Sequence, residues 1–167
     1  MRPFVLIEAG RARVRPFVER DLSSFVHDLL REQGHEEMLE NVPKGVRCLH
    51  PLGTLLDKLD AISGRFGRGA EEAVFARHYE DAAHSIRAYG QFPALDATPM
   101  ELAVELLRAR DIRAIPSHED EAFAPDASRL EALEEASQKI ARMFWGERIP
   151  AEECCRIIRD WIQAHLR

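Results

Sequence analysis

Residues 51–87 read PLGTLLDKLDAISGRFGRGAEEAVFARHYEDAAHSIR and predict two helices joined by a loop rich in glycine and arginine. In the first helix, Leu55, Leu59 and Ile62 recur at helical spacing and predict a buried face. Lys58 follows Leu55 by three residues and precedes Ile62 by four, so it shares that face. An unpaired ammonium group is costly to bury, so Lys58 must either extend to water or meet an anion.

The second helix carries an apolar stripe with polar residues at or beside its edge. The stripe consists of Phe75, Tyr79, Ala82 and Ile86, and the polar residues are Arg77, His78 and Asp81. If the two helices pack together, a lysine, a carboxylate and an Arg-His pair come close to one another. On periodicity alone, an ion pair between Lys58 and Asp81, or two charges that point to water, is a commoner outcome than a functional site.

The same positions resemble the C-terminal half of the AbiEii/AbiGii-type nucleotidyltransferases, the toxin family that includes the MenT toxins. The match consists of Pro51, Thr54 and Lys58, followed by Arg77, His78, Tyr79 and Asp81. The family often has a second tyrosine where this chain has Glu80. Upstream, residues 5–18 resemble a family strand, with matches at Glu8, Gly10 and Pro16, and downstream residues 130–166 resemble its closing pair of helices.

This resemblance implies transfer of a nucleotide from a nucleoside triphosphate with Mg²⁺, onto RNA such as tRNA, in a toxin–antitoxin or phage-defence setting. It implies catalytic roles for Lys58 and Asp81 and a metal-binding role for Glu8. The nucleotide and phosphate contacts would be Lys58, Arg65, Arg68, Arg77 and His78.

One departure from the family concerns the metal site. Family members begin with a Gly-Ser segment and an Asp-x-Asp pair that bind the metal ions and the triphosphate. This sequence contains neither, and its only Ser-Gly, Ser63-Gly64, has no Asp-x-Asp after it. The chain therefore looks like the family without its N-terminal catalytic segment. Two hypotheses follow: a nucleotidyltransferase-like protein, truncated or inactive alone, or a non-catalytic helical interaction module or subunit that completes a split enzyme. The expected protein partners are an antitoxin or an N-terminal partner chain.

Length and composition predict a single domain over residues 1–167, because 46% hydrophobic and 31% charged residues can build a core without disulfides or metals. The predicted class is α+β, mainly α, with a small N-terminal antiparallel β element packed on a helical bundle. Residues 1–50 would hold the strands, a remnant of the nucleotidyltransferase core, and residues 51–167 the helices. The predicted strands are Phe4–Ile7, Arg11–Val18 and Val46–Leu49.

Capping signals predict the remaining helices. One helix runs from Leu22 to Gln33 before Gly34, and the second helix of the opening stretch stops at Gly90. Later helices start at Thr98, with a capping-box Glu101, at Asp126 and at Pro150. Residues 112–125 form an acidic loop bounded by prolines.

Charge and cysteine content limit the protein's environment. The net charge of -6 argues against a general nucleic-acid-binding surface, although residues 1–20 are basic, with five arginines against two glutamates. That end is either a solvated strand face or a contact surface for RNA or an acidic antitoxin. No apolar run is long enough to span a membrane or resembles a signal peptide, so a cytoplasmic location is expected. The neighbours Cys154 and Cys155 lie in a predicted helix, where at most one is expected to face the core.

Overall fold

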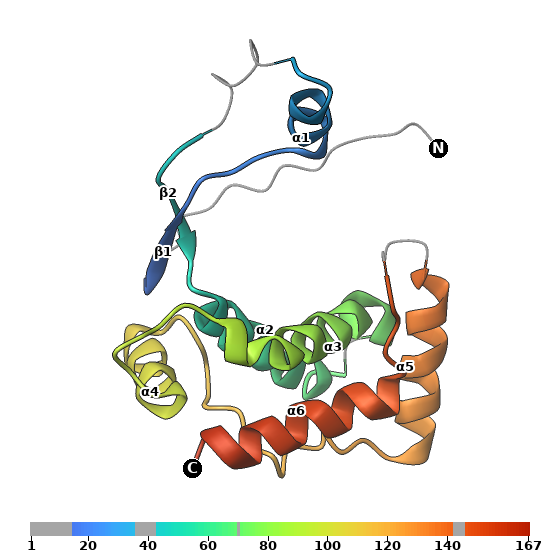
Figure 1. The fold of residues 1–167 in the computed structure, drawn as a ribbon. Coiled ribbons are helices and arrows are strands. Elements are labelled where there is room, and N and C mark those ends of the chain that lie inside the picture. The colour runs from blue at the N-terminus through green and yellow to red at the C-terminus, as the bar shows by residue number, and fades with distance from the viewer. Residues whose placement is uncertain (1–14, 36–42, 70, 142–145) are drawn as a thin grey trace. The chain divides into compact units, whose positions relative to one another are not determined.

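The structure is a computed structural model that describes residues 15–35, 43–69, 71–141 and 146–167. These ranges are mainly helical and include one two-stranded antiparallel sheet, so the predicted α+β, mainly α class is confirmed (Figure 1). None of the helices in these ranges is long and apolar enough to cross a membrane.

The chain divides into two compact units, residues 1–50 (the strand unit) and residues 51–167 (the helical unit). The strand unit contains β1 (Phe17–Arg20), α1 (Phe25–Glu32) and β2 (Val46–Leu49). The strands pair antiparallel, with Phe17 opposite Leu49 and Arg20 opposite Val46. β2 has the predicted bounds. The predicted strand Phe4–Ile7, the residue Glu8 and residues 11–14 of the predicted strand Arg11–Val18 lie outside the described residues. In the described half of that prediction, the strand begins only at Phe17 and continues to Arg20.

Helix α1 exposes most of its apolar side chains. It begins at Phe25, later than the predicted Leu22, because the Ser24 side chain caps it by accepting a hydrogen bond from the backbone N–H of His27. Phe25 is 95% exposed, and Val26 and Leu29 are also exposed. Within residues 15–35 and 43–50, no apolar side chain is buried. The described part of the strand unit therefore has no hydrophobic core of its own.

The helical unit is built around helix α3. Its elements are α2 (Pro51–Phe66), α3 (Glu72–Arg87), the 3₁₀ turn η2 (Tyr89–Gln91), α4 (Pro99–Ala109), α5 (Ala127–Lys139) and α6 (Ala151–His165). Helix α3 packs against α2, α5 and α6, while α4 contacts α2 (Figure 1). It ends at Arg87, before the predicted Gly90, because the chain tightens into η2. Helix α2 runs through Gly64 to Phe66, so the loop rich in glycine and arginine is shorter than expected.

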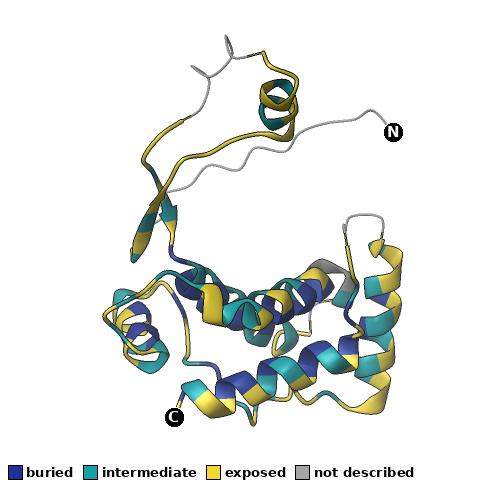
Figure 2. Cartoon of the chain, viewed as in Figure 1, coloured by how far each residue is buried: buried dark blue, intermediate teal, exposed yellow. Residues whose placement is uncertain are grey.

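The core of the helical unit lies between the inward faces of these helices, as Figure 2 shows. Leu55, Leu59, Ile62, Phe75 and Tyr79 are all buried, as their helical spacing predicted. Burial of such apolar side chains is the main favourable term in folding.

The N-terminal caps predicted for α4 and α5 are confirmed. The Thr98 side chain accepts a hydrogen bond from the Glu101 backbone N–H, and the Glu101 carboxylate accepts one from the Thr98 backbone N–H. Asp126 caps α5 through the Arg129 backbone N–H. The expectation for the adjacent cysteines is wrong, because Cys154 and Cys155 are both buried. α6 buries a face wide enough for both, and burial raises the pKa of each thiol to about 12.

The acidic loop at residues 112–125 is attached to α2 and α3. The Asp60 carboxylate accepts hydrogen bonds from the backbone N–H groups of Arg113 and Ala114, at 3.0 and 3.3 Å, and from Arg113 Nε at 3.0 Å. The Tyr79 hydroxyl donates to the carbonyl of Ala122 at 2.7 Å. The Arg113 guanidinium also fills the space where a side chain on Gly64 would lie. The loop is thus held at both ends by buried or half-buried polar groups.

This packing predicts an unusual result for Gly64→Ala. An alanine normally stabilises a helix interior by about 1 kcal/mol relative to glycine. Here the added methyl group must push Arg113 away from Asp60, and the loss of charge-assisted hydrogen bonds offsets that gain. We expect no stabilisation by Gly64→Ala in the wild-type chain, but about 1 kcal/mol in an Arg113→Ala background.

Urea unfolding of the four proteins of this cycle measures the effect, with Gly90→Ala as a control because the space around Gly90 is open. Equal effects of Gly64→Ala in both backgrounds would contradict the role assigned to Arg113.

Candidate functional site

The interface of α2 and α3 brings together Lys58 and Asp81. Lys58 Nζ lies 2.7 Å from Asp81 Oδ2, and the two side chains are 23% and 39% exposed. The ion pair foreseen as the commoner outcome therefore forms between the helices. Exposed and partly exposed pairs of this kind contribute only about 0–1 kcal/mol to stability. A competing ligand could replace either partner at little cost in folding free energy.

Further along the same helix pair, Arg65 contacts His78. Arg65 Nη1 donates a hydrogen bond to His78 Nε2, so this nitrogen acts as an acceptor and the imidazole is neutral. Burial, followed by the positive charges of Arg65, Lys58 and Arg77, lowers the pKa of His78 from 6.5 to about 4. Asp81 opposes this shift. His78 therefore adds no positive charge to the site near pH 7.

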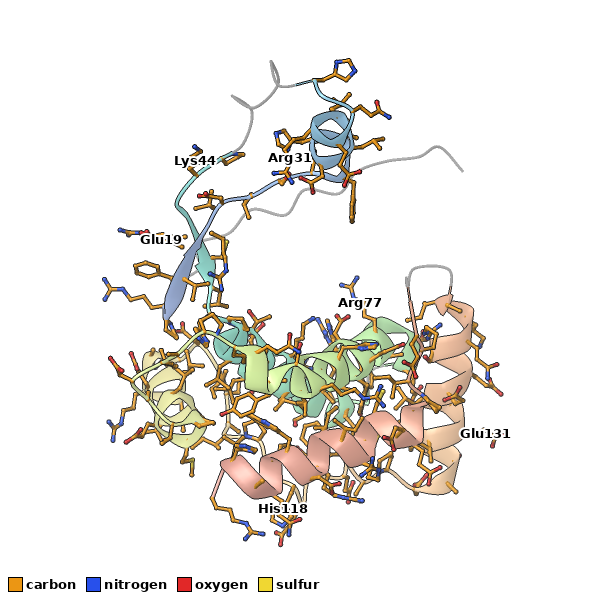
Figure 3. All side chains as sticks on the ribbon, viewed as in Figure 1. Glu19, Arg31, Lys44, Arg77, His118 and Glu131 are labelled. Carbon is orange, nitrogen blue, oxygen red and sulfur yellow. The ribbon has the colours of Figure 1, made fainter. Side chains whose placement is uncertain are left out.

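Two more predicted phosphate contacts lie at the border of this interface. Arg77 is exposed, and its side chain extends away from α3 (Figure 3). Arg68 is exposed in the turn after α2. Neither side chain forms a hydrogen bond or ion pair within the described part of the chain. Two carboxylates lie near these cations, Asp81 and Asp57, and the charges of Lys58 and Arg65 act on Asp57. The four described cations outnumber them, which makes this surface suited to an anion. We call it the α2–α3 cationic surface.

Glu80 is a structural residue that periodicity did not identify. Its carboxylate is only 3% exposed and accepts hydrogen bonds from Arg148 Nε at 2.8 Å and from the backbone N–H of Ile149 at 3.1 Å. Arg148 also donates to the Ser137 hydroxyl at 2.8 Å. The helical spacing does indicate that Glu80 lies on a buried face. Glu80 follows Ala76 by four residues and precedes Ala83 by three, and both alanines are buried. Glu80 is thus a buried carboxylate with its own set of partners.

The residues of this surface do not fit a magnesium site. A two-metal site for nucleotidyl transfer needs clustered carboxylates. In the described ranges, no group of three or more His, Cys, Asp or Glu side chains is placed to hold a metal ion. The predicted ligand Glu8 lies outside those ranges. Among the described residues, the α2–α3 cationic surface therefore has an excess of cations over carboxylates and no cluster of metal ligands.

Comparison with protein-family models, curated proteins and solved structures finds no match to this chain. The functional assignment therefore depends on the residues themselves and on the sequence resemblance.

The lowered pKa of His78 predicts a pH-dependent stability. Between pH 6.5 and about 4 the unfolded chain takes up a proton on His78 that the folded chain does not, so the free energy of unfolding falls as the pH is lowered through this window. His78→Gln keeps an acceptor for Arg65 but cannot take up the proton. We expect a flatter dependence of stability on pH for His78→Gln, measured by urea unfolding at several pH values.

His118→Gln is the matched control, because it removes a histidine from the loop before α5. If His78→Gln and wild type lose stability in parallel below pH 6.5, His78 is not neutral in the folded protein.

The burial of Glu80 predicts a large loss of stability for Glu80→Ala. This change removes the acceptor of Arg148 Nε and of the Ile149 backbone N–H, while Arg148 Nη2 keeps its hydrogen bond to Ser137. Loss of one member of a buried ion pair costs about 3–5 kcal/mol, and partial exposure of Arg148 favours the lower end. Glu80→Gln retains an acceptor oxygen and should lose less.

Chemical unfolding measures both variants against Glu131→Ala, whose exposed side chain points away from α5 (Figure 3). A loss for Glu80→Ala no larger than that of Glu131→Ala would contradict the network.

Proposed function

We propose that the α2–α3 cationic surface binds the phosphates of a nucleoside triphosphate, and that the protein is a nucleotidyltransferase-like protein of the AbiEii type. It would act in the cytoplasm in toxin–antitoxin or phage defence, with RNA such as tRNA as acceptor. The observation that carries this proposal is the meeting of Lys58 and Asp81 at 2.7 Å, beside the Arg65–His78 contact. Lys58, His78 and Asp81 are among the positions that carry the resemblance to that family, and Arg65 is one of the anion contacts that the resemblance implies.

Each side chain has a chemical role in this proposal. Lys58 has three N–H donors on a flexible side chain, so it can turn from Asp81 to a phosphate oxygen. Arg65 is held by the neutral His78 and directs a fork of donors to the same region. Once a phosphate takes over Lys58, the Asp81 carboxylate is available to accept a hydrogen bond from the attacking hydroxyl. Arg77 and Arg68 would extend the surface along the triphosphate or the RNA backbone.

The metal-binding carboxylates of this reaction would come from elsewhere. The described residues offer no cluster that could hold Mg²⁺, and the sequence has no Asp-x-Asp pair. We therefore assign the α2–α3 cationic surface to substrate binding and leave the metal to Glu8 together with carboxylates outside this sequence, for example on a partner chain.

A second candidate function is a non-catalytic interaction module or a subunit that completes a split enzyme. The specific observation in its favour is the absence of buried apolar side chains in the described part of the strand unit. A two-stranded sheet and one short helix without a core are marginally stable at best in water. On this hypothesis a partner polypeptide supplies the missing core, and that partner could also carry the metal-binding segment.

Binding of a nucleoside triphosphate in the absence of metal ions distinguishes the nucleotidyltransferase-like function from the interaction module. Because the described phosphate contacts are side-chain cations, ATP or GTP should bind in the presence of EDTA, with an affinity that falls as salt is added. Lys58→Ala should weaken this binding by about tenfold, equivalent to about 1.4 kcal/mol. Asp81→Asn should strengthen it, because Asp81 competes with the phosphate for Lys58. Isothermal titration calorimetry measures all three.

Lys139→Ala is the matched control, because Lys139 is an exposed lysine of the same unit, at the end of α5. No binding of any of the common nucleoside triphosphates, or equal affinity in wild type and Lys58→Ala, would refute the proposed phosphate site and favour the interaction module.

A further inference from the structure

A groove lies beside the loop that precedes α5. It consists of two adjoining cavities of about 500 and 200 Å³ that share Ala124 and Pro125. The larger cavity is also lined by Phe66, Glu121, Asp126 and Arg129, and the smaller by Phe123, Leu130, Glu152, Cys155, Arg156 and Arg159. None of these residues belongs to the α2–α3 cationic surface, so the groove is a separate feature of the helical unit.

The wall of the groove is held in place by the core. Phe123 is fully buried, and its neighbour Ala122 accepts the Tyr79 hydrogen bond at 2.7 Å. On the other side of the shared wall, Asp126 caps α5 through the Arg129 N–H at 2.8 Å. The Ala124–Pro125 segment between these anchors has little freedom to collapse into either cavity. The groove is therefore formed before any ligand arrives, as is usual for binding sites.

The larger cavity has an excess of negative charge. Its one cation, Arg129, already forms an ion pair with Glu72 at 3.0 Å and lies over the Phe66 ring at 4.6 Å. The Asp126 carboxylate uses one oxygen for the cap of α5. The carboxylate of Glu121 forms no hydrogen bond or ion pair with any described residue. Carboxylates without a side-chain cation of their own suit a guanidinium or ammonium group.

The smaller cavity has both apolar and charged lining residues. Its apolar lining includes Phe123, Leu130 and Cys155. Of its charged residues, Arg156 is already bound to Glu153 at 2.7 Å and to Asp160 at 3.1 Å. The other two, Glu152 and Arg159, have opposite sign. This cavity suits an apolar side chain next to the basic one.

We propose that the groove binds an extended peptide segment of a partner protein, with a basic side chain in the larger cavity and a neighbouring apolar side chain in the smaller. Charge complementarity selects the basic side chain, and the shared Ala124–Pro125 wall sets the two side chains close together along the peptide. Pockets that accept alternate side chains of an extended peptide are what give such binding its specificity.

Titration of the full chain with two capped peptides, Ac-Ala-Arg-Ala-Leu-Ala-NH₂ and its reverse order, tests this proposal. At least one should bind saturably below about 1 mM in calorimetry or NMR. Replacing its arginine by citrulline, which has the same shape without the charge, should weaken binding about two- to fivefold, the effect of one exposed ion pair. Replacing its leucine by alanine should weaken it about tenfold.

Variants of the protein test whether the peptide binds in the groove. In Glu121→Gln the difference between the arginine and citrulline peptides should disappear, whereas Glu131→Gln on α5 should retain it. Ala124→Phe places a large ring on the exposed shared wall and should abolish binding, while circular dichroism and the unfolding midpoint confirm that the variant is folded.

Several outcomes would overturn the proposal: no saturable binding of either peptide, equal binding of the arginine and citrulline peptides to wild type, or unchanged binding by Ala124→Phe. Lys58→Ala should bind the peptide normally, so a failure here is distinguishable from a failure of the nucleotide site.

Discussion

The buried carboxylate of Glu80 is the constraint on which the arrangement of the helical unit depends. A carboxylate that is almost fully removed from water needs nearly all of its hydrogen-bond acceptors satisfied. Arg148 and the Ile149 N–H meet this need, and Arg148 continues to Ser137 on α5. A single carboxylate on α3 therefore links α5 and the start of α6 to the central helix.

This link also sets the rotation of α3 about its axis. Successive residues of an α-helix are turned by about 100°. With Glu80 directed toward Arg148, its neighbour Asp81 is turned by one such step and meets Lys58 of α2, and His78 meets Arg65. Which side chains of α3 face α2 at the candidate site thus depends on a polar network on another face of α3. A neutral His78 further reduces repulsion among the cations and leaves their charge available for an anion.

The two units differ in how they are stabilised. The helical unit has a continuous apolar core and polar anchors at Asp60, Tyr79 and Glu80 that attach its loops to its helices. In the described part of the strand unit, the strands pair by backbone hydrogen bonds while Phe25 and its apolar neighbours on α1 remain exposed. The helical unit is therefore stabilised by its own core, whereas the described part of the strand unit is stabilised by backbone pairing.

The sequence by itself determined the helices, several of their ends and the pair of helices that carries the candidate site. Apolar periodicity and the caps at Thr98 and Asp126 are local signals, because they depend on residues within a few positions of each other. Lys58 and Asp81 were identified in the same way, as charges on or beside apolar faces. The N-terminus of α1 was misplaced because Ser24 caps the helix after an apolar Leu22.

Tertiary structure alone decided which polar groups meet. Asp60 with Arg113 and Glu80 with Arg148 are separated by 53 and 68 residues, so no local pattern pairs them. Packing likewise buried both Cys154 and Cys155, and it allowed the guanidinium of Arg113 to occupy the space left by Gly64. Periodicity shows which face of a helix is buried, whereas the choice of polar partners depends on the packing of distant segments around each face.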